Sequence, residues 1–97
     1  MIQIQSSKLL DGTDYDAWVK LFESEEAKKM RAAAGLKVLA YGWSAEKERV
    51  FTVVEMDDPQ TVQKLMQTPE AAALMAKAGV DKSAMEMIPL HNGKPGI

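Results

Sequence analysis

The sequence contains no cysteine and only one histidine among its 97 residues. Without cysteine the chain forms no disulfide, and it offers neither a thiolate nucleophile nor the sulfur ligands of zinc and iron–sulfur sites. A single histidine supplies too few nitrogen ligands for a typical zinc site. We therefore expect no metal and no other cofactor.

The sequence also lacks a surplus of positive charge and a long apolar run. Twelve basic residues against fourteen acidic ones give a net charge of −2, whereas proteins that bind nucleic acid need extra Lys and Arg for the phosphates. No segment approaches the roughly 20 apolar residues of a membrane span, and the first residues do not resemble a signal peptide. We expect a cytoplasmic protein with no nucleic-acid and no membrane partner.

Apolar and polar residues alternate in several short segments, and this period of two is typical of β-strands. The alternation predicts four strands, at residues 2–5, 36–43, 50–56 and 84–90.

Two longer segments, residues 14–34 and 59–78, instead repeat their apolar residues with the period of a helix. Each contains a residue suited to cap a new helix, Ser24 and Thr68, so we expect both helices to kink or restart there. A shift of 44 positions superimposes the two caps and the Ala-Gly-aliphatic sequence that ends each helix. The chain is therefore built from two similar halves.

The element order β-α-β-β-α-β predicts an α+β, ferredoxin-like sandwich with a four-stranded antiparallel sheet and two kinked helices on one face. Residues 1–90 form this single domain. Residues 91–97 contain two glycines and a proline, and we expect them to be a flexible C-terminal tail.

Two helices cover only one face of such a sheet, so the two sets of alternating side chains have different roles. The smaller, mostly aliphatic set is expected beneath the helices: Ile2, Ile4, Val38, Ala40, Val50, Thr52, Val54, Ala84 and Ile88. The set with larger side chains is expected on the open face: Gln3, Gln5, Leu39, Tyr41, Trp43, Phe51, Val53, Glu55, Met85 and Met87. An apolar face of this size is unusual in a monomer. We therefore expect a homodimer formed through the open sheet face.

Topology, chain length and the turns at the helix ends resemble the dimeric α/β-barrel superfamily, whose members are similar to antibiotic biosynthesis monooxygenases. The resemblance to one of its small uncharacterised families rests on Asp16-x-Trp18-Val19-Lys20-x-Phe22-x-Ser24, Ala33-Ala34-Gly35 and Met75-Ala76-x-Ala78-Gly79. It implies that two sheets close into one barrel. The superfamily includes cofactor-independent monooxygenases, isomerases and polyketide cyclases. Its haem-degrading members use an Asn on the first strand, where this chain has Gln3 and Gln5.

A mostly apolar set of side chains with a few polar groups is typical of a small-molecule pocket. The candidate ligand-binding residues are Gln3, Gln5, Tyr41, Trp43, Phe51 and Glu55. The candidates for proton transfer are Glu55, Tyr41 and His91, the one imidazole of the chain. The helix charges Lys28, Lys29 and Arg31 are interpreted as part of a solvated face.

Three functions remain open at this point. The first is a protein of uncharacterised role that binds a small apolar or aromatic molecule. The second is a cofactor-independent monooxygenase, isomerase or cyclase that acts on an aromatic or polyketide-like substrate. The third is an assembly or regulatory module without enzymatic activity. A cavity that touches polar side chains favours a ligand, and a filled interior favours assembly.

Overall fold

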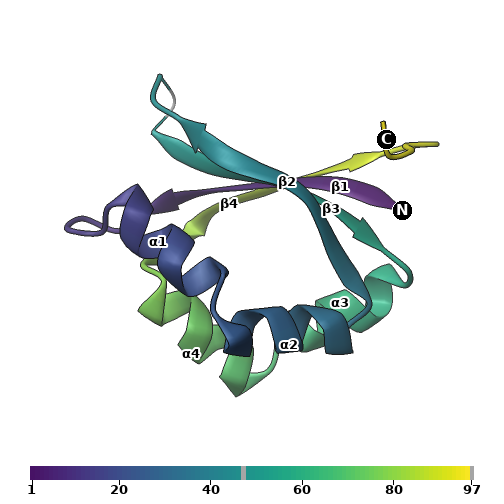
Figure 1. Ribbon diagram of the computed structural model, residues 1–97, viewed down its shortest axis with the longest axis horizontal. Coiled ribbons are helices and arrows are strands. Elements are labelled where there is room, and N and C mark those ends of the chain that lie inside the picture. The colour runs from purple at the N-terminus through teal and green to yellow at the C-terminus, as the bar shows by residue number, and fades with distance from the viewer. Residues whose placement is uncertain (47, 97) are drawn as a thin grey trace.

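The computed structural model describes residues 1–46 and 48–96 and contains four strands and four helices. In chain order the elements are β1 (Ile2–Leu9), α1 (Tyr15–Phe22), α2 (Glu25–Ala33), β2 (Leu36–Ser44), β3 (Arg49–Met56), α3 (Pro59–Met66), α4 (Pro69–Lys77) and β4 (Val80–Leu90). The strands pair antiparallel in the order β2-β3-β1-β4, and all four helices cover one face of the sheet (Figure 1). The predicted α+β, ferredoxin-like fold is confirmed. None of the described helices is long and apolar enough to cross a membrane.

Each predicted long helix is divided in two at the predicted cap. The hydroxyl of Ser24 accepts a hydrogen bond from the backbone N–H of Ala27 at 3.2 Å. Thr68 accepts from the N–H of Ala71 at the same distance. Because the hydroxyls satisfy backbone donors that a helix start leaves free, α2 and α4 can begin directly after α1 and α3. The expected breaks at Ser24 and Thr68 are confirmed.

The assignment of side chains to the two sheet faces needs a correction. On β3 the buried residues alternate, and Val50 and Thr52 belong to the side beneath the helices. Gln5 of β1 and Tyr41 of β2 lie opposite Thr52, and Trp43 lies opposite Val50. Residues that face each other across paired strands share a face. Gln5, Tyr41 and Trp43 therefore point toward the helices, and the expectation that they lie on the open face is wrong.

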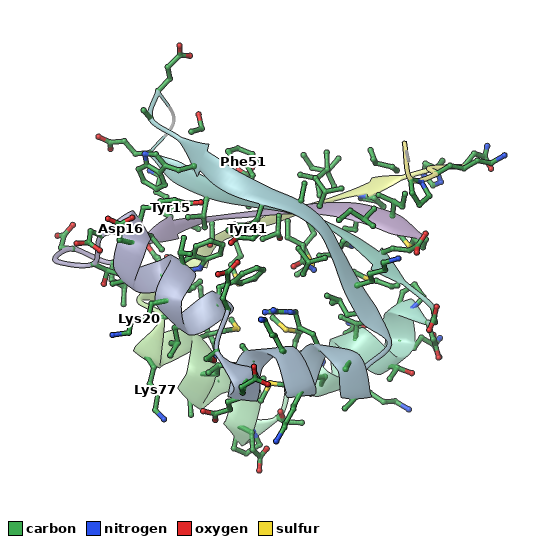
Figure 2. The ribbon with its side chains drawn as sticks, in the orientation of Figure 1. Tyr15, Asp16, Lys20, Tyr41, Phe51 and Lys77 are labelled. Atoms are coloured by element: carbon green, nitrogen blue, oxygen red, sulfur yellow. The ribbon has the colours of Figure 1, made fainter. Side chains whose placement is uncertain are left out.

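An irregularity in β2 is one cause of this difference. The register shifts between Val38 and Ala40, which is the pattern of a β-bulge, and the extra residue reverses the side-chain alternation beyond it. Beyond the bulge the two large rings of β2 face the helices. Figure 2 shows Tyr41 on the same side of the sheet as Tyr15 of α1, with Phe51 on the opposite side.

The side chains of β1 also lie on the opposite faces of the sheet from those predicted. Gln3 pairs with Val54 on the helix side, and Ile4 pairs with Val53 on the open side. Ile2 is nevertheless only 3% exposed. Gly93 of the turn after β4 lies against it, since a Cβ on Gly93 would be 3.2 Å from the Cβ of Ile2. The open face is therefore partly covered at this end by residues that follow β4.

Two separate apolar clusters hold the helices on the sheet. One is centred on Val54, Met56 and Val62, beneath α3 and the end of α2. The other is centred on Trp18, Val50 and Ala78, beneath α1 and the end of α4. The middle of the sheet lies between these clusters, and this is where the candidate site is found.

Candidate functional site

Two adjoining cavities of about 150 Å³ each lie between the sheet and the helices. They share the following lining residues: Gln5, Phe22, Ala27, Arg31, Thr52, Met66, Leu74 and Met75. The first cavity extends toward Trp18, Val80 and Met85, and the second extends toward Leu36 and Val62. Together they form one continuous region beneath the helices, which we call the helix–sheet cavity.

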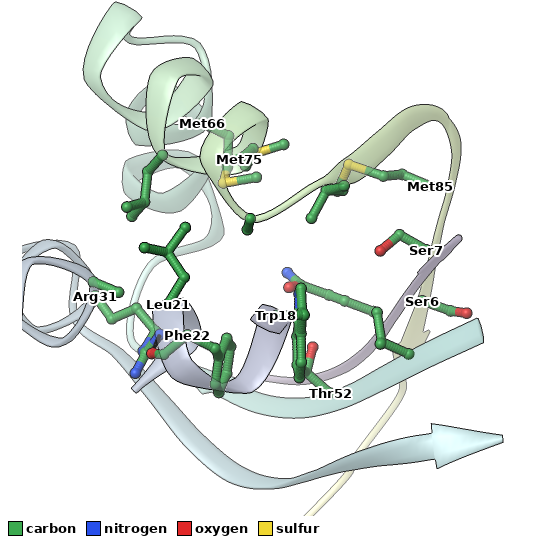
Figure 3. Close-up of a pocket in the computed structure, with 16 residues that line it drawn as sticks. Ser6, Ser7, Trp18, Leu21, Phe22, Arg31, Thr52, Met66, Met75 and Met85 are labelled. Atoms are coloured by element: carbon green, nitrogen blue, oxygen red, sulfur yellow. Dashed lines mark hydrogen bonds between the residues drawn. The ribbon is translucent and has the colours of Figure 1, made fainter. Parts of the chain in front are cut away.

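The wall formed by the second half of the chain is rich in methionine. Met66 ends α3, Met75 lies in α4 and Met85 lies on β4, and all three line the first cavity (Figure 3). Thioether side chains are flexible and polarizable, and they make favourable contacts with aromatic rings. This wall can adapt to the shape of an apolar molecule.

The opposite wall carries stacked aromatic rings. Trp18 and Phe22 lie one helical turn apart on α1, with ring centroids 4.6 Å apart and ring planes 20° from parallel. Tyr41 packs behind Phe22, with the ring centroids 4.9 Å apart. Trp18 and Phe22 line the first cavity. Each ring of this wall is packed against another ring.

Arg31 of α2 lines both cavities and brings a positive charge into this apolar region. Its guanidinium lies over the ring of Phe22, 4.2 Å from the centroid, and its Nη1 donates to the backbone carbonyl of Phe22 at 2.9 Å. Burial lowers the pKa of Arg31, and the nearby negative charge of Glu23 partly opposes this shift. Arg31 remains protonated at neutral pH, since arginine starts from a very high pKa.

Two buried residues with hydroxyl groups add polar character to the lining. Ser7 and Thr52 are each 7% exposed, and both line the first cavity. Within residues 1–46 and 48–96, no buried side-chain oxygen or nitrogen lacks a hydrogen-bond partner, so neither hydroxyl is both buried and unpaired. Gln5 lies between them in the sheet, and its Nε2 donates to Oε1 of Gln3 at 3.0 Å. Because a hydroxyl can both donate and accept, Ser7 and Thr52 can form a hydrogen bond with a molecule in the cavity.

The structure separates the six predicted ligand-binding residues. Only Gln5 lines the helix–sheet cavity. Gln3 is its hydrogen-bond partner, and Tyr41 and Trp43 lie on the same side of the sheet, packed against α1. Phe51 and Glu55 lie on the open face.

The three candidates for proton transfer do not meet in one place. Glu55 is on the open face, opposite Ile2 and Lys37 of the neighbouring strands. His91 is exposed in the turn after β4. Tyr41 donates a hydrogen bond to Oε1 of Glu23, and this bond is the main reason that the pKa of Tyr41 is raised. A raised pKa keeps the phenol protonated, so Tyr41 is a hydrogen-bond donor at neutral pH and a poor base.

Sequence analysis missed Arg31, Thr52 and Ser7 as site residues. Arg31 was assigned to a solvated helix face together with its basic neighbours. The signal was in the helical spacing, because Arg31 follows buried Ala27 by four residues and precedes buried Ala34 by three. These spacings put all three residues on one face of α2. Thr52 was correctly expected beneath the helices, but as a packing residue and not as part of a site. For Ser7 the face depends on strand register, which the sequence pattern did not give.

Among the described residues, no cluster of three or more His, Asp or Glu side chains is arranged to hold a metal ion.

The family model of a domain of unknown function, DUF3764, matches residues 8–88 of the chain. The chain belongs to the DUF3764 family. The match includes all four helices and every cavity-lining residue except Gln5, Ser6 and Ser7, so most of the cavity lies within the DUF3764 domain. No curated protein matches the sequence.

Solved structures of other proteins share the fold of this DUF3764 domain. A NIPSNAP family protein of unknown function from Agrobacterium tumefaciens has a TM-score of 0.64 at 15% identity, over 89% of this chain and 81% of its own. An antibiotic biosynthesis monooxygenase-like protein from Chloroflexus aurantiacus has a TM-score of 0.54 at 16% identity, over 98% and 97%. The expected resemblance to the antibiotic biosynthesis monooxygenase-like superfamily is confirmed. At these identities the likeness concerns the fold alone.

Proposed function

We propose that this protein binds a small aromatic molecule in the helix–sheet cavity. The observation that carries the proposal is the lining itself, in which stacked rings and methionine thioethers surround a few polar groups. Small-molecule sites have this composition, with mostly apolar walls and a small number of polar groups that fix orientation. The thioethers of Met66 and Met75 favour a ring over an aliphatic chain of the same size.

The volume of the cavity limits the ligand to a single ring or a ring with a short substituent. An apolar cavity of roughly 150 Å³ is large enough to bind benzene. Each of the two adjoining cavities has about this volume. A ring in one cavity therefore leaves space for a substituent that extends into the other.

The lining favours binding over proton transfer. In the part of the chain that the structure describes, no carboxylate and no imidazole lines either cavity. The polar groups present are hydroxyls, an amide and a guanidinium, none of which is a general base at neutral pH. Catalysis by Glu55, Tyr41 or His91 would require a site elsewhere. The fold shared with a monooxygenase-like protein supports that alternative only at the level of topology.

Binding of toluene, measured by NMR chemical-shift perturbation, tests the proposal. We expect saturable shifts at residues that line the cavity, such as Trp18 and Met75. Ala27 is 3% exposed and lines both cavities, so Ala27→Leu should fill the space and abolish these shifts. Ala33→Leu is the matched control, because Ala33 is exposed on the same helix and should leave binding unchanged. Absence of saturable shifts, or shifts that persist in Ala27→Leu, would contradict the proposal.

We also propose that the open sheet face mediates a homodimer. An apolar row crosses all four strands of this face, formed by Ala40, Val53, Ile4 and Ile88 in register. Charges of both signs flank the row, with Arg49 against Ser6 on one side and Glu55 on the other. A second copy related by a twofold axis can cover the row and pair these charges, which makes it a suitable partner.

Two neighbouring residues of β4 provide the test of the dimer. Ile88 is 48% exposed on the open face, whereas Met87 is 53% exposed and belongs to the helix side. Ile88→Glu should convert the dimer to monomer in sedimentation velocity, because it buries a charge in the interface. Met87→Glu should remain dimeric. A wild-type protein that is monomeric at micromolar concentration would exclude the dimer.

A further inference from the structure

We propose that the ligand of the helix–sheet cavity is a small aromatic carboxylate and that Arg31 binds its carboxylate group. This inference rests on the proposed function, because it specifies the chemical class of the molecule in the same cavity. It predicts that a negatively charged ring compound binds more tightly than a neutral compound of the same shape.

The position of Arg31 is the first argument. Figure 3 shows its side chain at one end of the cavity, close to Phe22, with Met66 and Met75 on the adjoining wall. Arg31 is the one cation that lines either cavity among residues 1–46 and 48–96. A ring that packs against Phe22 and the methionines would hold its substituent next to the guanidinium.

The unused donors of Arg31 are the second argument. A guanidinium has five N–H donors in a planar arrangement that matches the two oxygens of a carboxylate. In the described part of the chain, one hydrogen bond of this group is made, from Nη1 to the carbonyl of Phe22 at 2.9 Å. This bond ties α2 to the end of α1, which is a structural role. It leaves the rest of the planar group free to bind an anion.

The charge of Arg31 is also poorly balanced by the protein. No carboxylate of residues 1–46 and 48–96 forms an ion pair with it. The Phe22 ring at 4.2 Å compensates only part of the charge, since a cation–π contact is weaker than a hydrogen-bonded ion pair. The carboxylate of Glu23 accepts a hydrogen bond from the hydroxyl of Tyr41 and acts on Arg31 through its charge, without forming an ion pair with it. An anionic ligand would complete the environment of a partly desolvated cation, and a neutral ligand would not.

Benzoate and benzamide provide a matched pair of probes, because they have the same number of heavy atoms and differ in charge. We expect wild-type protein to bind benzoate at least about tenfold more tightly than benzamide, as expected for a charge-assisted hydrogen bond. This comparison uses isothermal titration calorimetry at neutral pH and requires no variant. Equal affinities of the two compounds would overturn the role of Arg31.

Two variants then assign the preference to one residue. Arg31→Met keeps an unbranched apolar side chain and removes the charge, so the preference for benzoate should disappear while benzamide affinity stays within about twofold. Lys28→Met removes a charge from the exposed part of the same helix and should keep the preference. A preference that survives in Arg31→Met, with a folded protein by circular dichroism, would also overturn the inference.

Failure of this inference can be distinguished from failure of the proposed function. If toluene binds in the cavity and benzoate binds no more tightly than benzamide, the cavity is a site for neutral rings and only the inference is wrong. If toluene, benzamide and benzoate all fail to bind, the proposed function is wrong as well.

Discussion

Gly79 lies so close to Thr13 that a Cβ on the glycine would be 2.2 Å from the threonine Oγ1. The contact joins the end of α4 to the loop between β1 and α1, and the carbonyl of Gly79 accepts a hydrogen bond from the N–H of Leu10 at 2.7 Å. Gly79 also has a φ of +74°, which residues with a Cβ rarely adopt. Position 79 therefore requires glycine for two reasons: its backbone conformation and its close contact with Thr13 in the first half of the chain.

Replacement of Gly79 separates these two requirements when it is compared with Gly12. Gly12 has a φ of +86° but no atom within 4 Å of a Cβ, so Gly12→Ala should cost only the backbone strain, about 1 kcal/mol. Gly79→Ala should lower the free energy of unfolding by about a further 1–3 kcal/mol, because the methyl group meets Thr13. Urea denaturation of both variants measures the difference. Equal losses would show that Thr13 moves away without cost.

The cap at Thr68 has an expected energetic effect. Thr68→Ala should lower the free energy of unfolding by about 1 kcal/mol, because the N–H of Ala71 loses its acceptor at the start of α4. Thr68→Ser keeps the hydroxyl and should stay close to wild type. Chemical denaturation measures both variants, and an equal loss in Thr68→Ser would mean that the hydroxyl is not the stabilising group.

The hydrogen bond from Tyr41 to Glu23 predicts a pH dependence of stability. The pKa of Tyr41 is raised in the folded protein by this bond, so the stabilisation is complete below the unfolded pKa, about 10. It is lost as the pH rises through the higher folded pKa. Tyr41→Phe should lower stability at neutral pH and reduce the further loss above pH of about 10. A wild-type profile that is identical to that of Tyr41→Phe in this range would contradict the assignment.

The candidate site could be predicted from the sequence only in part. Helical spacing placed Trp18 and Phe22 on one buried face, and both line the cavity. The same spacing contains the position of Arg31, but a charged residue on a helix with many charges was interpreted as solvated. The strand residues were harder, because alternation defines two faces without saying which one meets the helices. In β2 the bulge between Val38 and Ala40 reversed the alternation, and nothing in the local composition marks it.

The sequence by itself determined the order of elements, the breaks at Ser24 and Thr68 and the ferredoxin-like fold, because these depend on local periodicity and on caps within a few residues. The faces of β3 followed from its alternation, but only the tertiary structure decided which side of β1, of β4 and of β2 beyond the bulge lies beneath the helices, since this depends on register and on packing between distant segments. Beyond the bulge the large rings lie on the helix side, where Tyr41 meets Trp18 edge-on and Trp43 packs at a tilt against Tyr15. The cavity arises because two separate clusters hold the helices at either end of the sheet, and it places Arg31, Ser7 and Thr52 together although they come from three different elements.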